Sequence, residues 1–254
     1  MDLGLSGKAV LVTGASTGIG AAVARAFGRQ RARVAVHYHR SADEAAGVVA
    51  AIGAEGGKGF AIQGDVRVPE EVRAVVDGAA ARFGRLDIVV NNAGALVRRS
   101  LVADQTDELL FEVLALNVQS VVVASRAAVA HFRRQGGGCL VNVTSIAARN
   151  GGGPGSSLYA GAKGFVSTFT RGLARELAAE RIRVNAIAPG VIETPFHERF
   201  STPEQLAALR ATIPMGRLGV ADECVGAFLY LASDALSGYV TGQVIEVNGG
   251  QLMP

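Results

Sequence analysis

Three residues in the middle of the chain have the types and the spacing for proton transfer at a carbonyl oxygen. Tyr159 precedes Lys163 by four residues, so both side chains lie on one face if this segment is helical. A lysine beside a phenol lowers the pKa of the phenol, which makes Tyr159 a candidate acid and base. The hydroxyl of Ser145 can hold the reacting oxygen. Such tyrosine–lysine pairs also occur on ordinary helix surfaces, so the surrounding elements must decide the interpretation.

A glycine-rich turn near the N-terminus predicts a site for a pyrophosphate. An apolar strand over 9–12 leads into the turn, and an Ala-rich helical stretch continues to about residue 29. Backbone N–H groups and the helix dipole favour an anion at such a turn. A plain connection between strand and helix is the alternative. The candidate residues are Gly14, Ser16, Thr17, Gly18, Ile19 and Gly20.

The end of the second expected strand, 33–38, bears on the choice of cofactor. An acidic residue here would bind the ribose of NAD, whereas a basic residue would accommodate the 2′-phosphate of NADP. The strand is followed by His39 and Arg40, and no carboxylate occurs before Asp43. These residues favour NADP(H), with NAD(H) as the alternative. Thr17 argues the other way, because it leaves the glycine turn without a basic residue.

The same order of apolar strand and helix continues along the chain. Further strands are expected at 59–62, 86–90, 140–143, 183–188 and 243–247, separated by helices. Buried strands that alternate with helices indicate an α/β fold with a doubly wound parallel sheet of about seven strands and helices on both faces. We predict a single domain over 1–254. Ser145 follows a strand at the edge where such sheets bind ligands. The irregular, proline-containing stretch 191–216 is a candidate substrate lid, or an ordinary connection.

Composition narrows the class of protein. The net charge is +3, but basic residues never run beyond two in a row, so we expect no nucleic-acid partner. No continuous apolar run reaches the ~18 residues of a membrane helix, and no signal-peptide pattern is present. We therefore expect a cytoplasmic protein without a membrane partner. Cys139, Cys224 and the four histidines lack ligand spacing, so no metal is predicted.

Together these motifs resemble the short-chain dehydrogenase/reductase family, in a form whose length matches this chain of 254 residues. In the family's order the motifs are Thr13–Gly20, Asp65, Asn91–Gly94, Asn117, Ser145, Tyr159, Lys163 and Pro189–Gly190. The resemblance implies a Rossmann-type fold and an NAD(P)(H)-dependent oxidoreductase that interconverts a secondary alcohol and a ketone. The chain is similar to 3-oxoacyl-[acyl carrier protein] reductases and to sugar or polyol dehydrogenases.

The resemblance also implies roles for single residues. Tyr159 transfers the proton, Ser145 binds the substrate oxygen, Lys163 binds the nicotinamide ribose, and Asn117 fixes a water that links Lys163 to solvent. Further cofactor-binding residues are implied around the adenine, the adjoining ribose and the carboxamide: Asp65, Val66, Asn91, Ala93, Gly94, Pro189, Gly190, Ile192 and Thr194. The end of the second strand lacks the family's usual acidic or basic residue, so Arg40 or His39 must serve.

Several expectations go beyond the reaction. Basic residues near the expected pocket rim, Arg98, Arg99, Arg149 and His197, suit an anionic substrate or are solvated surface. A dinucleotide-binding regulatory protein without catalysis is the alternative function, and the intact catalytic set argues against it. By resemblance we expect a D₂ homotetramer. Its contacts would come from two apolar helices and the C-terminal tail: Leu109–Val123, Phe165, Phe169, Leu173, Leu177 and Gln251–Pro254.

Overall fold

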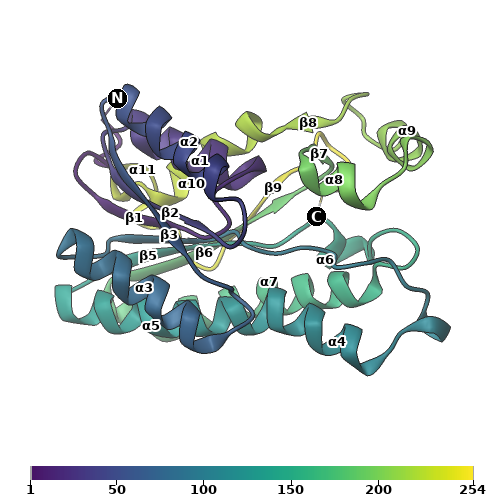
Figure 1. The fold of residues 1–254 in the computed structure, drawn as a ribbon, viewed down its shortest axis with the longest axis horizontal. Helices are drawn as coiled ribbons and strands as arrows, with labels where there is room; N and C mark the ends of the chain where they lie inside the picture. The colour runs from purple at the N-terminus through teal and green to yellow at the C-terminus, as the bar shows by residue number, and fades with distance from the viewer. Residues whose placement is uncertain (1, 254) are drawn as a thin grey trace.

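Parallel strands build the central sheet of the computed structural model, which describes residues 2–253 except for the side chain of Glu198. The strands are β1 (Ala9–Val12), β2 (Arg33–Tyr38), β3 (Lys58–Gln63), β4 (Ile88–Asn91), β5 (Gly138–Val143), β6 (Ile182–Pro189) and β9 (Val244–Val247). Their order is β3-β2-β1-β4-β5-β6-β9, and every neighbouring pair is parallel (Figure 1). The predicted doubly wound sheet of about seven strands is confirmed.

Helices cover both faces of this sheet because its strands are apolar on both sides. Val10 and Val12 pack in one core cluster, and Leu11 between them packs in the other. The first cluster lies under α1 (Gly18–Arg29), α2 (Ala42–Ala54) and α10 (Ala221–Ala232). The second lies under α3 (Pro69–Phe83), α5 (Ser120–Gln135) and α7 (Ser157–Leu177). Figure 1 shows these two sets of helices above and below the strands.

Shorter elements gather at one end of the molecule. The strands β7 (Ile192–Glu193) and β8 (Gly219–Val220) form a second, two-stranded sheet. Between them in the sequence lie α8 (Pro195–Phe200) and α9 (Pro203–Ala211). Figure 1 shows α8 and α9 at the same end as α6 (Ala147–Asn150). The remaining elements are the 3₁₀ turns η1 (Val102–Asp104) and η3 (Ala178–Glu180) and the short helix α11 (Asp234–Ser237).

The helical region that follows Thr106 is interrupted. It consists of α4 (Asp107–Leu114), a π-helical turn η2 (Ala115–Gln119) and α5. The whole stretch Asp107–Gln135 is long and apolar enough, by length and composition, to cross a membrane. The sequence, without a continuous apolar run of that length, predicts no such segment. The α5 part packs against the sheet through residues such as Val123 and Phe132, which explains why the helix is apolar.

Candidate active site

Ser145, Tyr159, Lys163 and Asn117 come together at the carboxyl ends of β4 and β5. Ser145 lies two residues beyond the end of β5, and Lys163 donates from Nζ to the carbonyl of Val143, the last residue of that strand, at 2.8 Å. A Cβ atom at Gly94, just after β4, would lie 2.7 Å from Asn117 Oδ1 and 3.0 Å from Lys163 Nζ. The absent side chain of Gly94 therefore lets these two polar groups approach.

The Ser145 hydroxyl lies close enough to the Tyr159 phenol to lower the pKa of that phenol. Ser145 is oriented by the turn into α6, because its Oγ accepts from the backbone N–H of Ala147 at 3.1 Å. Burial raises the pKa of Tyr159 to about 12, and the nearby Ser145 hydroxyl offsets this only in part. The lowered pKa predicted from the sequence is therefore wrong for this structure. At neutral pH the phenol is protonated.

Lys163 is almost fully buried, with 3% of its surface exposed, on the first turns of α7. Burial lowers the pKa of its ammonium group to about 8, because a charge is costly away from water. Its Nζ lies 5.7 Å from the centre of the Tyr159 ring, over the aromatic face. Nζ donates a hydrogen bond to the carbonyl of Val143, so the end of β5 fixes the ammonium group beside the phenol.

Asn117 lies in the π-helical turn and is fully buried. Its side chain donates to the carbonyl of Ala95 at 2.9 Å and accepts from the N–H of the same residue at 3.1 Å. A second bond runs from its Nδ2 to the Val113 carbonyl at 3.0 Å. The amide thus lies at the interruption of the helix, inside the protein. Asn117 therefore fixes the loop after β4, which contains Gly94, beside Lys163.

The glycine turn has the geometry that a pyrophosphate requires. Gly14 has φ +61° and Gly18 has φ +55°, values that favour glycine. A Cβ at Gly20 would lie 2.2 Å from the carbonyl oxygen of Gly14, so only glycine fits there. Thr17 stands at the N-cap of α1 without a side-chain cap bond, and the first turn holds no acidic residue. The N–H groups of this turn, around Ser16 and Ile19, therefore remain for an anion.

Two residues without an assigned role in the sequence analysis position this turn. The Thr13 hydroxyl accepts from the N–H groups of Asn92 and Ala93, each at 3.0 Å. Asn92 donates in return to the carbonyls of Thr13 and Gly14, both at 2.9 Å. These bonds tie the glycine turn to the end of β4. A polar residue at the end of an otherwise apolar strand was the available signal for Thr13.

His37 supports the same turn from β2 and was also missed. Its Nδ1 accepts from the N–H of Gly14 at 3.0 Å, and its Nε2 lies 3.0 Å from the carbonyl of Gly64. These partners require the neutral ring with the proton on Nε2. Burial lowers the pKa of His37 to about 4, so the ring stays neutral at physiological pH. A histidine in the apolar run of β2 was the signal.

The expected adenosine side of the site lies where β2 and β3 end. Asp65 forms a two-pronged ion pair with Arg67, whose Nη2 lies 2.6 Å from Oδ2, and this bond lowers the pKa of Asp65 to about 2. His39 Nε2 lies 3.7 Å from the same carboxylate. Arg40 is exposed, and Val66 is buried beside the sheet. Arg67 is a charged group of this region that sequence reasoning did not include.

The remaining cofactor candidates line the carboxyl ends of β4 and β6. The Asn91 side chain points into the core, where it donates to Asn142 Oδ1 at 2.8 Å, so only its backbone faces the sheet edge. Pro189 ends β6, and a Cβ at the following Gly190 would meet Asn248 at 2.7 Å. Ile192 lies in β7. Thr194 stands against the glycine turn, since a Cβ at Gly18 would lie 3.4 Å from its side chain.

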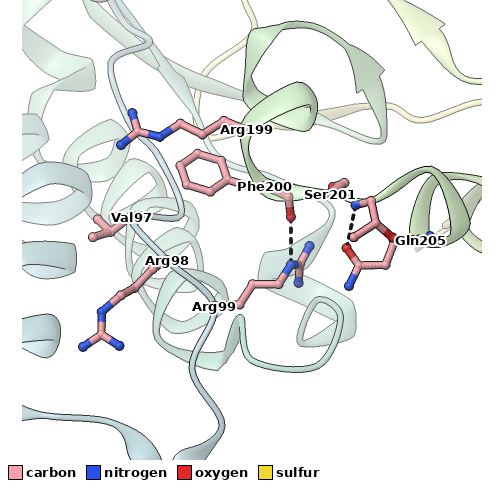
Figure 2. A pocket seen from close by; sticks show the side chains of 8 residues that line it. Val97, Arg98, Arg99, Arg199, Phe200, Ser201 and Gln205 are labelled. Atoms are coloured by element: carbon pink, nitrogen blue, oxygen red, sulfur yellow. Dashed lines mark hydrogen bonds between the residues drawn. The ribbon is translucent and has the colours of Figure 1, made fainter.

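The four basic rim candidates differ in what they contact. Arg99 donates to the backbone carbonyls of Phe200 at 2.9 Å and Pro154 at 3.1 Å, and Figure 2 shows the first of these bonds. Arg149 lies 3.1 Å from the carboxylate of Glu246 on β9. His197 shares a hydrogen bond of 3.0 Å with Ser201, just beyond the end of its own helix. Arg98 is exposed.

The part of the chain that the structure describes contains no cluster of side chains that could bind a metal ion. Across residues 2–253, no group of three or more His, Cys, Asp or Glu side chains lies together as metal ligands would. Cys139 and Cys224 are buried free thiols, and burial raises the pKa of each to about 11.

Comparison with known proteins places this geometry in a family. The family profile described as enoyl-(acyl carrier protein) reductase matches residues 14–251. The 3-oxoacyl-[acyl-carrier-protein] reductase of Synechocystis sp. is 37% identical over 249 residues, which cover 98% of each chain. The 3beta-hydroxysteroid dehydrogenase 1 of Eggerthella lenta is 40% identical over 255 residues, covering 98% of this chain and 95% of that protein.

Solved structures agree over the whole length. The NADH-dependent reductase A1-R′ in complex with NAD is 33% identical, has a TM-score of 0.89, and the match covers 100% of both chains. A short-chain dehydrogenase of Burkholderia cenocepacia in complex with NADP is 37% identical, also with a TM-score of 0.89, and the match covers 97% of this chain and 98% of that one.

Fold, glycine turn and relatives therefore define a nicotinamide-dependent oxidoreductase that acts on CH–OH groups and ketones. The chain belongs to the short-chain dehydrogenase/reductase family.

Proposed function

We propose that this enzyme interconverts a secondary alcohol and a ketone, with Tyr159 as the acid and base. The observation that carries the proposal is the proximity of the Tyr159 and Ser145 hydroxyls beside the buried ammonium group of Lys163. A carbonyl oxygen held between the two hydroxyls would gain negative charge during reduction, and both groups would stabilise that charge. The alternative, a regulatory protein without catalysis, has no observation in its favour.

In the direction of reduction, a nicotinamide bound at this site would supply the hydride for the carbonyl carbon. Tyr159 donates its proton to the carbonyl oxygen, and its high pKa in this structure supplies the protonated form that this step needs. Ser145 holds the oxygen through the step. Lys163 carries a positive charge at neutral pH, which would stabilise the phenolate that Tyr159 becomes and would bind the ribose hydroxyls.

Asn117 acts in this proposal as a positioning residue. Its amide is occupied by the backbone of Ala95 and Val113, so it holds the loop that borders Lys163. The water relay implied by the family resemblance would then use other atoms of this turn. If so, Asn117→Ala should lower kcat and broaden the pH profile of kcat, whereas a purely structural role would change only the thermal midpoint.

We propose NADP(H) as the preferred cofactor. Arg40 is exposed at the end of β2, and the nearby carboxylate of Asp65 is already paired with Arg67. A 2′-phosphate would therefore meet positive charge from Arg40, with His39 beside it. The two solved neighbours hold NAD and NADP, so relatives of both kinds exist. We expect Arg40→Ala to raise KM for NADPH about tenfold and to change KM for NADH little. Equal changes for both cofactors would contradict the preference.

The substrate is proposed from relatives and from the lid. The Synechocystis relative is named a 3-oxoacyl-[acyl-carrier-protein] reductase, and reductase A1-R′ is described as responsible for alginate metabolism. We propose a 3-oxoacyl thioester or a sugar-derived ketone as the substrate class. Residues 191–216 would cover it as a lid, since Phe196 of α8 lies 5.9 Å from the Tyr159 ring, centre to centre.

We also propose a cytoplasmic homotetramer. Phe111 on α4 and Phe165 on α7 are exposed to 67% and 43%, and Phe165 stacks on Phe169, which gives an apolar surface for a second subunit. Leu109 and Leu177, which the sequence assigns to this surface, are buried within the subunit itself. Pro254, at the end of the tail contact, lies outside the described residues. Light scattering should give four times the 26.1 kDa chain mass, and a monomer at micromolar concentration would refute the assembly.

A panel of ketones tests the function directly. Purified protein would be assayed with 3-oxoacyl thioesters, keto sugars, keto sugar acids and a 3-ketosteroid, each with NADPH and with NADH. We expect oxidation of the cofactor with at least one class. No turnover with any member would leave the regulatory alternative in place of the proposed reaction.

A further inference from the structure

A cavity of about 450 Å³ lies between the loop after β4 and the end of α8. This volume is in the range of small-molecule sites. Its charged lining residues are Arg98, Arg99 and Arg199, and no acidic side chain that the structure describes lines it. Figure 2 shows Arg98 and Arg99 on one wall and Arg199 with Phe200 on the other. We call it the arginine cavity.

A chain of aromatic contacts connects the arginine cavity to the catalytic tyrosine. The ring of Tyr159 lies 5.9 Å from that of Phe196, which in turn lies 5.0 Å from that of Phe200, centre to centre. Phe200 lines the cavity. A ligand that places its carbonyl at Tyr159 and extends along Phe196 would therefore bring its far end into the cavity.

The three arginine side chains of the cavity differ in the contacts that they make. Arg99 donates hydrogen bonds to the backbone carbonyls of Phe200 and Pro154, so it connects the loop after β4 to these two segments. The guanidinium of Arg199 lies 5.2 Å from the centre of the Phe200 ring, which orients it without using its hydrogen-bond donors. Neither Arg98 nor Arg199 takes part in a salt bridge among the described side chains.

Arg98 follows directly after a backbone turn that is strained at Val97. Val97 has φ +70°, and the N–H of Arg98 bonds back to the carbonyl of Leu96 at 3.0 Å. This is a γ-turn of the rare kind, and a β-branched residue at positive φ is a true outlier. Strain of this kind is concentrated at ligand sites in proteins.

We propose that Arg98 and Arg199 bind an oxyanion, a carboxylate or a phosphate, at the end of the substrate remote from its ketone. The enzyme is then selective for anionic ketones, and this inference rests on the proposed function. Both arginines line the same cavity, no described carboxylate is paired to either, and a guanidinium group donates readily to the oxygens of such a group. The oxyanion has two sources among the proposed substrates: the carboxylate of a keto sugar acid, or the phosphate of a phosphopantetheine thioester.

Two matched substrate pairs test the proposal and separate the sources. One pair is a keto sugar acid and its methyl ester, and the other is acetoacetyl-4′-phosphopantetheine and acetoacetyl-pantetheine. Within each pair only the oxyanion differs, so the readout is the ratio of kcat/KM for the charged member to that for the uncharged member. The variants are Arg98→Gln and Arg199→Gln. Arg73→Gln, on α3, is the control, because it removes the same charge from a surface pair with Glu70.

We expect the wild-type ratio to exceed one for one pair, and that pair identifies the source. Each cavity variant should lower this ratio about tenfold, and Arg73→Gln should leave it unchanged. Thermal melting of each variant confirms that it is folded. A ratio near one for both pairs, or a ratio that neither cavity variant lowers, overturns the proposal while the ketone activity stands. Wild-type protein that reduces no ketone overturns the proposed function and this inference together.

Discussion

Substitution of Gly94 by alanine disturbs the proposed catalytic centre without replacing any of its side chains. The new Cβ would lie 2.7 Å from Asn117 Oδ1 and 3.0 Å from Lys163 Nζ, whereas ordinary contacts begin at 3.4 Å. Both polar groups must therefore move by several tenths of an ångström. Lys163 is held by the Val143 carbonyl and Asn117 by two backbone residues, so neither can move without weakening its own bonds.

The magnitude follows from that displacement. A misplacement of about 1 Å near the reacting groups can cost about a hundredfold in rate, so we expect kcat to fall about ten- to a hundredfold. Overpacking should cost about 1–3 kcal/mol of stability. The assay is steady-state oxidation of NADPH or NADH with the best ketone of the panel, together with a thermal melt.

Gly53→Ala is the matched control. Gly53 lies inside α2, where an added methyl group would have no atom within 4 Å, and alanine is the better helix former by about 0.5–1 kcal/mol. We expect unchanged kcat and slightly higher stability for this variant. If Gly94→Ala keeps its kcat within twofold of the wild type, Lys163 and Asn117 are not positioned as we describe.

Two further predictions concern buried polar groups. Burial lowers the pKa of His37 from 6.5 to about 4. Between these pH values the unfolded chain binds a proton that the folded protein does not bind. The free energy of unfolding therefore decreases, by up to roughly 3 kcal/mol, as the pH is lowered through this range. Urea titrations of His37→Asn should show a flatter dependence over this range, and an unchanged slope would contradict the buried neutral ring. Asn142→Ala removes the bonds to Asn91 and Thr170 and should destabilise by roughly 2–4 kcal/mol. A urea midpoint equal to that of the wild type would show that this network contributes nothing.

The strands were predictable because their signal is local. A run such as that of β1 or β2 is largely apolar and β-branched, and a strand buried on both faces requires this. The predicted bounds of β1 and β2 agree with the structure. The glycine turn was equally readable, since Gly14 and Gly18 follow a strand and precede a helix.

Other features depend on partners that are distant in sequence. The buried position of Asn117 follows from its bonds to Ala95, 22 residues earlier, and a single amide in a helical pattern does not reveal them. Arg149 was indistinguishable from Arg98 in the sequence, yet it pairs with Glu246 on the last strand of the sheet.

Electrostatics was the least predictable property. The spacing of Tyr159 and Lys163 correctly places them near each other, but it does not determine which effect controls the pKa of the phenol. Burial of Tyr159 raises this pKa, and the nearby Ser145 hydroxyl lowers it only in part. The sign of such a shift depends on packing, which spacing alone does not contain.

The turnover of Tyr159→Phe tests the central claim most directly. The phenylalanine ring keeps the packing against Phe196 and lacks only the hydroxyl that we propose as the proton donor. With the best ketone and saturating cofactor, we expect kcat to fall about 10²- to 10⁴-fold, the usual contribution of a positioned acid, while the thermal melt shows a folded protein. A folded Tyr159→Phe protein with the kcat of the wild type would show that the proton comes from another group.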